Sequence, residues 1–403
     1  MAVGSSSSVE WQLTMVTGKA LGGSTKINGL IYHRSVPGEY NAWQDAGRKN
    51  WSWQHVEPFF KKSEDSLSHG TSPSRGIEGP WQNQSVKEHF ASVRTNVKIA
   101  TEFGVPLLTE ANDPGAPVVA CTPLDATIDR ENHRCSTDAA FLPRSLVSRR
   151  RNLNICTGTI CTSLDIKDGN PLEVNGVFIE VESDVTQRYH VTATREVILC
   201  AGAVATPQIL LFSGIGPERP LKEIGVKVFK DLPGVGARFQ DHISVPIMFK
   251  ALLDNSIEVL MGKPLTAVGQ FLKYILNGKG ILGQQVQQAD VVLRSALLDD
   301  NTQLYSMEPG ELDASKPSNI PDIEVMFLSV NATDQQFDGI AKSFGGFTYL
   351  CTVLRPQSYG SVQLTSSDPR QQPLWDIGTL TNEADRVPLQ KAMKLALMLA
   401  SNV

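Results

Sequence analysis

Short runs that alternate apolar and polar residues dominate the middle of the chain and predict strands. They lie at residues 152–156 (NLNIC), 162–166 (TSLDI), 176–181 (GVFIEV) and 189–200 (YHVTATREVILC). The end of the last run, 197–200, is continuously apolar, as expected of a strand buried on both faces. Residues 322–330 and 347–354 predict further strands. We therefore expect a small antiparallel or mixed sheet.

Apolar residues at helical spacing predict helices between and after these strands. The predicted helices cover residues 51–65 (with Ser52 as N-cap), 86–103, 207–212 (with Thr206 as N-cap), a helix ending near 271–276, and 386–401. In the last helix, Leu389, Met393, Ala396, Leu397 and Ala400 are expected to share one apolar face. Residues 66–84 are rich in Ser, Gly and Pro and predict a loop. Helices mixed with strands indicate an α/β (mixed α+β) fold class.

Composition narrows the possible partners. The chain has 403 residues, 41% of them hydrophobic and 20% charged, which is typical of a globular protein. A net charge of −5 argues against a nucleic-acid surface. Apolar windows such as 395–400 are far shorter than the ~20 residues of a membrane span, so no span is expected.

The six cysteines include no C-x-x-C pair and no spacing suited to zinc, so no metal site is predicted. We expect them to be free thiols, and those in the apolar runs (Cys156, Cys161 and Cys200) to be buried. Sequons at Asn50, Asn83 and Asn331 point toward secretion, although no signal peptide is visible.

Two glycine-rich stretches could approach a cofactor. The string at 278–283 (GKGILG) has dinucleotide-binding spacing, but a helical pattern precedes it, so we interpret it as a turn. Gly22 to Thr25 combines two glycines with two hydroxyls, which suits close approach to a flat, polar cofactor. A helix that begins near Ser24 would direct its positive end at an anion. An ordinary glycine turn before a helix is the alternative.

The residues around this second stretch resemble the first signature of the glucose–methanol–choline (GMC) flavoenzymes. The matching residues of GKALGGSTKIN…Y and GEYNAW are Gly18, Lys19, Leu21, Gly22, Gly23, Ser24, Thr25, Ile27, Asn28, Tyr32 and Asn41. Ser35 departs from the pattern, because the family prefers Gly, Ala or Pro at this position. The run 202–216 (GAVATPQILLFSGIG) resembles the second signature at every defined position. The resemblance extends from about residue 12 to the end.

The resemblance implies a fold in two parts. A Rossmann-like FAD-binding domain, discontinuous and without its N-terminal βαβ unit, is expected at residues 1–66 and 145–242. A substrate domain with a mixed or antiparallel sheet and helices is expected at residues 67–144 and 243–403. This second domain is expected to be incomplete at its C-terminal end.

The resemblance also implies a reaction and a site. Family members hold FAD and oxidise an alcohol, and O₂ or a quinone-type acceptor then reoxidises the flavin. The expected cofactor-binding residues are Gly22, Gly23, Ser24, Asn28, Gly29, Leu30 and Ile31 on the flavin side, and Ile160, Gly202 and Ala203 on the adenosine side. The partners are thus a small-molecule alcohol and this acceptor.

Two parts of the family pattern are missing from the sequence. No G-x-G-x-x-G unit precedes Gly18, and no histidine follows His242, although the family's proton-accepting histidine lies in a C-terminal stretch. We therefore assign no catalytic residue and expect a chain truncated at both ends. We interpret His242 as structural, and the family has no base at the position of His33. The alternative hypothesis is a non-catalytic remnant that cannot retain FAD.

Overall fold

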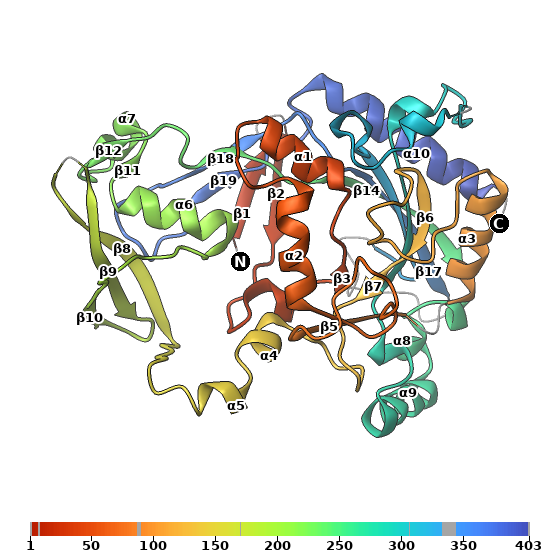
Figure 1. The fold of residues 1–403 in the computed structure, drawn as a ribbon, viewed down its shortest axis with the longest axis horizontal. Coiled ribbons are helices and arrows are strands. Elements are labelled where there is room, and N and C mark those ends of the chain that lie inside the picture. The colour runs from red at the N-terminus through yellow and green to blue at the C-terminus, as the bar shows by residue number, and fades with distance from the viewer. Residues whose placement is uncertain are drawn as a thin grey trace. The chain divides into compact units, whose positions relative to one another are not determined.

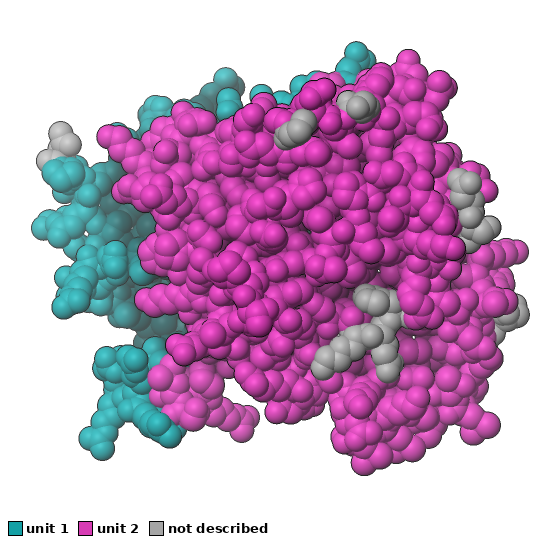
Figure 2. Space-filling view, turned by 45° about the vertical axis from the view of Figure 1, so that its right-hand side comes forward, with its two compact units in different colours: residues 1–17, 148–241, 356–383 teal, residues 18–147, 242–355, 384–403 magenta. Residues whose placement is uncertain are grey.

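The computed structural model describes residues 2–6, 9–86, 90–169, 171–305, 307–332 and 344–401 (Figure 1). The chain divides into two units (Figure 2). Unit 1 comprises residues 1–17, 148–241 and 356–383, and unit 2 comprises residues 18–147, 242–355 and 384–403. Residues 18–66, which the sequence assigns to the FAD-binding domain, thus pack with unit 2. Packing alone does not show which residues hold a cofactor. The domain assignment stays a prediction.

A five-stranded antiparallel sheet forms the centre of unit 2. Its strands, in spatial order, are β14 (Ile243–Ala251), β17 (Gly345–Val353), β16 (Ile323–Leu328), β15 (Gln287–Leu293) and β6 (Ala120–Pro123). Both strands predicted in this part of the chain, at 322–330 and 347–354, are confirmed as β16 and β17. On β15 and β16 the odd-numbered residues Val291, Val325 and Phe327 belong to the hydrophobic core. Because strand side chains alternate, the even-numbered residues point to the opposite face.

Two helices, α3 (Ala91–Glu102) and α10 (Arg386–Ala400), contribute buried side chains to the core of this sheet. Both were predicted, although α3 begins later than residue 86; residues 87–89 lie outside the described part of the chain. The buried residues of α10 are Leu389, Ala392, Leu395, Ala396 and Leu399. The predicted face was therefore wrong at Leu397, which is 51% exposed. A neighbouring stripe of the same helix is buried because the sheet and α3 both contact it.

A second sheet of unit 2 has the order β3 (Ile31–Tyr32), β7 (Asp125–Ala126), β5 (Trp81–Ser85) and β4 (Glu64–Ser66). The predicted helix at 51–65 is α2 (Trp53–Ser63), with Ser52 at its N-cap position. It ends before Glu64 because that residue pairs with Trp81 in the sheet. The predicted loop at 66–84 accordingly contains most of β5.

The other α-helices of unit 2 are α1 (Pro37–Asp45), α4 (Thr137–Phe141), α5 (Arg144–Val147), α8 (Val259–Gly262) and α9 (Pro264–Asn277). The turns of 3₁₀ helix along the chain are Gly23–Lys26, Leu253–Asn255, Ile281–Gly283, Ser295–Leu297, Pro309–Glu311, Pro317–Asn319 and Glu383–Asp385. Helix α9 ends at Gly278, which has a left-handed φ of 64°. The string 278–283 is therefore a turn, as predicted, with no strand before it.

The described residues of unit 1 form three sheets. The largest has the order β13 (Ala237–Phe239), β18 (Gly360–Gln363), β19 (Leu374–Asp376), β1 (Ala2–Ser6) and β2 (Val9–Met15), and β1 pairs with β19 in parallel. The others are the antiparallel sheet β8 (Thr159–Lys167), β9 (Glu173–Val181) and β10 (Asp184–Thr192), and the parallel pair β11 (Ile215–Gly216) and β12 (Lys230–Asp231). Its α-helices are α6 (Gly202–Phe212) and α7 (Glu218–Glu223). Sheets and helices together confirm the mixed α/β class.

Several sequence predictions in unit 1 were wrong. Residues 152–156 and 197–200 form no strand, and Ile198 is 72% exposed. Among the described residues no strand pairs with 197–200, so hydrophobicity alone does not order this run as a strand. Cys156 and Cys200 are consequently exposed and Cys161 is partly buried, whereas Cys121, Cys135 and Cys351 are buried; all six thiols are free.

Helix α6 begins five residues before the predicted start. Thr206 was expected to be the N-cap, yet Gly202 is the first helical residue and Ala201 is the N-cap. The Thr206 hydroxyl instead accepts a hydrogen bond from the Ala201 N–H at 3.1 Å. This side chain therefore satisfies the helix N-terminus from one turn inside it. Gly214, with a φ of 73°, follows the helix end as expected. Among the described residues, no helix is both long and apolar enough to cross a membrane.

The stripe of α10 that faces the core predicts unequal effects of two leucine truncations. We expect Leu395→Ala to lower the free energy of unfolding by about 2–5 kcal/mol, because Leu395 is 1% exposed and its removal leaves a cavity. Leu397→Ala, two residues along the same helix, should change it by less than about 0.5 kcal/mol. Urea denaturation of both variants measures the difference, and equal losses would contradict the observed burial.

Candidate functional site

The glycine-rich loop that begins at Gly18 is closed on itself. The Gly18 N–H donates to Ser24 Oγ at 3.1 Å, and the Gly23 N–H donates to the Ala20 carbonyl at 2.9 Å. Gly22 and Gly23 have left-handed φ values of 89° and 53°. A Cβ on Gly18 would lie 2.3 Å from the Gly23 carbonyl oxygen, so the close approach requires glycine. The helix expected near Ser24 is a single turn of 3₁₀ helix.

Helix α4 anchors the middle of the loop. Thr25 Oγ1 accepts a hydrogen bond from the Thr137 N–H at 3.1 Å, and Thr137 Oγ1 donates to the Gly22 carbonyl at 3.2 Å. Lys26 forms an ion pair with Asp138 at 2.7 Å. These contacts tie both hydroxyl and backbone groups of the loop to one short helix.

The last part of the loop leads into β3. Asn28 Oδ1 accepts hydrogen bonds from Arg134 Nη1 at 2.6 Å and from the Leu30 N–H at 3.2 Å. The Thr127 N–H donates to the Leu30 carbonyl at 2.7 Å, and Ile31 pairs with Ala126. The seven predicted flavin-side residues therefore lie on one continuous, hydrogen-bonded segment of unit 2.

Two features of this segment bear on whether it fits a cofactor. A Cβ built on Gly23 would meet no heavy atom within 4 Å, so that side of the loop is open. A Cβ on Gly29 would instead lie 2.8 Å from Gln287 Oε1. This oxygen is buried and has no hydrogen-bond partner among the described residues. An open glycine and an unpaired polar atom beside the loop fit a polar, planar ligand.

The three residues predicted for the adenosine side lie in unit 1. Ile160 is on β8, opposite Glu180 of β9, and is partly buried. Gly202 and Ala203 are the first two residues of α6 and are exposed. Gly202 has a φ of 88°, and a Cβ there would meet nothing within 4 Å. Helix α6 contacts β8, so the three residues belong to adjacent elements of this unit.

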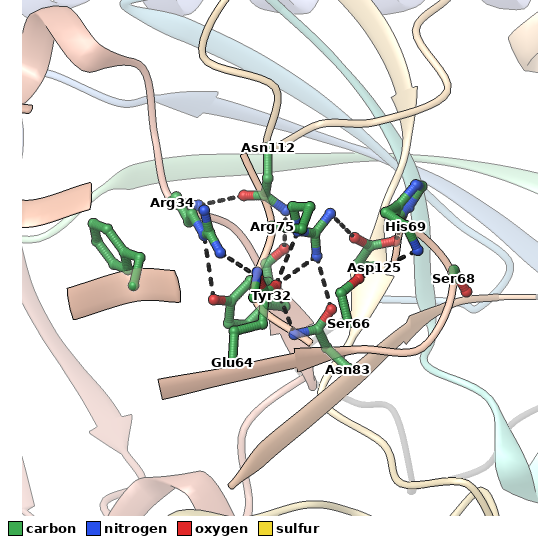
Figure 3. A network of polar contacts seen from close by, with 12 residues as sticks. Tyr32, Arg34, Glu64, Ser66, Ser68, His69, Arg75, Asn83, Asn112 and Asp125 are labelled. Atoms are coloured by element: carbon green, nitrogen blue, oxygen red, sulfur yellow. Dashed lines mark hydrogen bonds and ion pairs between the residues drawn. The ribbon is translucent and has the colours of Figure 1, made fainter. Parts of the chain in front are cut away.

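A buried ionic network holds the sheet that follows the loop (Figure 3). The Glu64 carboxylate accepts hydrogen bonds from Arg34 Nη2, from Arg75 Nη2 at 2.7 Å, from Asn83 Nδ2 at 2.9 Å and from the Gly76 N–H at 2.8 Å. The side chains of Arg34, Glu64 and Arg75 are almost completely buried. The sequence analysis did not identify this network, because its members are scattered over residues 32–125.

The same network continues to a histidine. Arg75 Nη1 lies 3.0 Å from Asp125 Oδ2, and His69 Nε2 lies 3.2 Å from Asp125 Oδ1. Burial by itself would raise the pKa of Asp125, but hydrogen bonds from His69 and Ser85 and the charge of Arg75 lower it below its ordinary value. The hydrogen bond to Asp125 raises the pKa of His69. Both shifts favour the ion pair over the neutral pair.

A cavity of about 450 Å³ in unit 2 adjoins the loop, since Ile31 lines it. His33 and His242 also line it, so the structure brings two of the seven histidines together. His33 Nδ1 accepts a hydrogen bond from the Ser35 N–H at 3.2 Å, and the ring also bonds to the Ala111 backbone. His33 is an exposed residue, so backbone contacts rather than burial hold its ring in place.

Two acidic residues of the cavity were missed by the sequence analysis. Asp290 on β15 and Glu324 on β16 line it, and both are more than nine-tenths buried. A carboxylate inside an otherwise apolar strand, as in residues 289–293 (ADVVL) and 323–328 (IEVMFL), is a signal that could have identified them. Among the described residues, no group of three or more His, Cys, Asp or Glu could hold a metal ion.

Comparisons with known proteins agree with the resemblance. The profile of the family described as GMC oxidoreductase matches residues 2–244. The chain is 30% identical over 384 residues to an oxygen-dependent choline dehydrogenase of Photobacterium profundum, covering 94% of this chain and 61% of that protein. It is 30% identical over 369 residues to an alcohol dehydrogenase [acceptor] of Pseudomonas putida, covering 91% and 61%. The chain thus spans about three fifths of the length of these relatives.

Solved structures share the fold. A formate oxidase matches with a TM-score of 0.83 at 23% sequence identity. The match covers 99% of this chain and 70% of the formate oxidase chain. The pyridoxine 4-oxidase from Mesorbium loti has a TM-score of 0.80 at 22% identity, with coverages of 99% and 69%. At these identities the likeness concerns the fold alone.

The buried network predicts that Glu64 is essential for stability. Glu64→Gln should lower the free energy of unfolding by about 3–5 kcal/mol, because two buried guanidinium groups lose their shared counter-charge. The matched control is Glu57→Gln on the surface of α2, where the pair with Lys61 contributes less than about 0.5 kcal/mol. Denaturant titration measures both, and a Glu64 variant as stable as the control would refute the prediction.

Proposed function

Because this chain belongs to the GMC oxidoreductase family, we propose that it is an FAD-dependent oxidoreductase acting on the CH–OH group of a small-molecule alcohol. The observation that carries the proposal is the position of Ile31. It lies on the predicted flavin-side segment and also lines the cavity of about 450 Å³. A cofactor along the loop would therefore border a space large enough for a small substrate.

FAD is the cofactor of the family. It supplies a hydride acceptor when bound. In this chain, Gly22, Gly23 and Ser24 would lie along the flavin, and Asn28 to Ile31 would lie near its ring and pyrophosphate side. Ile160, Gly202 and Ala203 retain the adenosine-side role that the resemblance implies.

The cavity would hold the alcohol and keep water from it. Apolar residues such as Val36, Val292 and Met326 form much of its wall. We propose no proton-accepting role for His33, because backbone groups of Ser35 and Ala111 engage its ring. His242 lines the same cavity, and we propose that it positions the wall rather than accepts a proton.

The electron acceptor is proposed to be O₂ or a quinone-type compound. The names of two relatives support either possibility, since one is an oxygen-dependent choline dehydrogenase and the other an alcohol dehydrogenase [acceptor]. The same two names support an alcohol as the substrate that is oxidised.

The open side of Gly23 predicts a specific loss of flavin binding. Gly23→Leu should weaken FAD binding at least about tenfold, or about 1.4 kcal/mol, because the side chain would occupy the space beside the loop. Gly47→Leu is the matched control: its φ is also left-handed (90°) and its Cβ would also meet nothing within 4 Å. The readout is the flavin band at about 450 nm after reconstitution and gel filtration.

A wild-type chain that stays colourless after reconstitution would contradict the proposal and support the alternative, a family member that does not retain FAD. Equal flavin binding by the Gly23 and Gly47 variants would place the cofactor elsewhere than along this loop.

A further inference from the structure

The cavity contains a pair of acidic side chains placed by strand register. β15 and β16 are antiparallel, and Asp290 pairs with Met326 while Val292 pairs with Glu324. Asp290 and Glu324 are therefore diagonal neighbours on the face opposite the hydrophobic core. They are 4% and 7% exposed, and both line the cavity.

In the part of the chain that the structure describes, the two carboxyl groups have each other as their only hydrogen-bonding side chains. They share a hydrogen bond, and among the described residues neither forms an ion pair with a lysine or arginine. Burial and the neighbouring charge of Glu324 raise the pKa of Asp290 well above its ordinary value. Burial also raises the pKa of Glu324. The pair therefore favours sharing one proton between its two carboxyl groups, and no cation of the described residues forms an ion pair with it.

The rest of the lining defines which cation would fit. The charged side chains of the lining are Glu39, Asp113, Asp290, Glu324 and Arg355, so carboxyl groups outnumber the single guanidinium. Among the described residues, the lining includes no Phe, Tyr or Trp. Aromatic rings are the usual partners of quaternary ammonium groups, whereas carboxylates accept hydrogen bonds from N–H donors. A protonated amine satisfies this lining better than a trimethylammonium group does.

We propose that the cavity binds an alcohol that carries a protonated primary or secondary amine, and that the amine donates N–H hydrogen bonds to Asp290 and Glu324. The inference rests on the proposed function in one respect: the oxidation of an alcohol is what requires the substrate to carry a hydroxyl group. A substrate amine with N–H groups would distinguish this chain from the relatives named for choline, because the nitrogen of choline carries no hydrogen. A divalent metal ion is a poorer occupant, since the described residues include no group of three ligating side chains.

Binding of the cation should be coupled to a proton. The proton shared by Asp290 and Glu324 would leave to solvent as the ammonium group replaces it, so affinity should rise with pH. The other titratable or charged groups around the pair are His33, Glu39, Asp113, Cys121, His242 and Arg355. The substrate amine stays protonated up to about pH 10, as a lysine does, so it is not the group that titrates.

Isothermal titration of the chain without FAD tests the proposal. The probes are aminopentanol, its trimethylammonium analogue and pentanediol, which share a chain length and a terminal hydroxyl. We expect aminopentanol to bind at least about tenfold more tightly than either of the others. We also expect it to bind more tightly at about pH 8 than at about pH 6. Equal affinity for the amine and the diol, or for the amine and its trimethylammonium analogue, would overturn the inference.

The double variant Asp290→Asn with Glu324→Gln should lose the preference for the amine and keep its affinity for the diol. Both substitutions preserve side-chain volume and remove a buried charge, so the fold should survive. Glu102→Gln, on the exposed surface of α3, is the charge-matched control and should keep the preference. If the double variant does not fold, the ranking of the three probes on the wild-type chain still decides. The titration needs no flavin, so it is independent of the test of the proposed function. A chain that does not retain FAD but prefers the amine would contradict the proposed function and support this inference.

Discussion

The buried carboxylate of Glu64 is the constraint on which the predicted cofactor segment depends. Arginine does not lose its charge in a protein, so Arg34 and Arg75 can be buried only against a permanent counter-charge. Glu64 supplies it from the first residue of β4, and Arg34 follows β3, the strand that ends the glycine-rich loop. The ion pairs therefore fix the position at which the chain leaves the loop and enters the sheet (Figure 3).

The central sheet of unit 2 has two different faces, and each has its own role. One face, with Val291, Val325 and Phe327, forms the core with α3 and α10 and carries the stability of the unit. The other face presents Asp290 and Glu324 to the cavity. Burying two carboxyl groups with few hydrogen-bond partners costs free energy of folding. The hydrophobic packing on the first face offsets this cost. Such a division is typical of sites in which burial is used to alter the charge state of acidic groups.

The sequence predicted elements well where local chemistry decides them. The strand at Phe347, the helix ending at Gly278 and the turn that follows it agree with the structure, because alternation and left-handed glycines act over a few residues. Predictions failed where distant contacts decide. Ile198 lies in an apolar run that is exposed, and Leu397 lies beside the buried stripe of α10. A local contact was missed as well: helix α6 begins at Gly202, and the Thr206 hydroxyl, predicted to be the N-cap, lies inside it and accepts a hydrogen bond from the Ala201 N–H.

By itself, the sequence determined the family, the mixed α/β class and the segment proposed to hold the flavin, since each depends on consecutive residues such as Gly22 and Gly23. Only the tertiary structure decided what surrounds that segment. Glu64 with its two arginines, and Asp290 with Glu324, join residues that are 11 to 34 positions apart, and no short pattern records such pairs. Their chemistry arises from burial and strand register, which are properties of the folded chain.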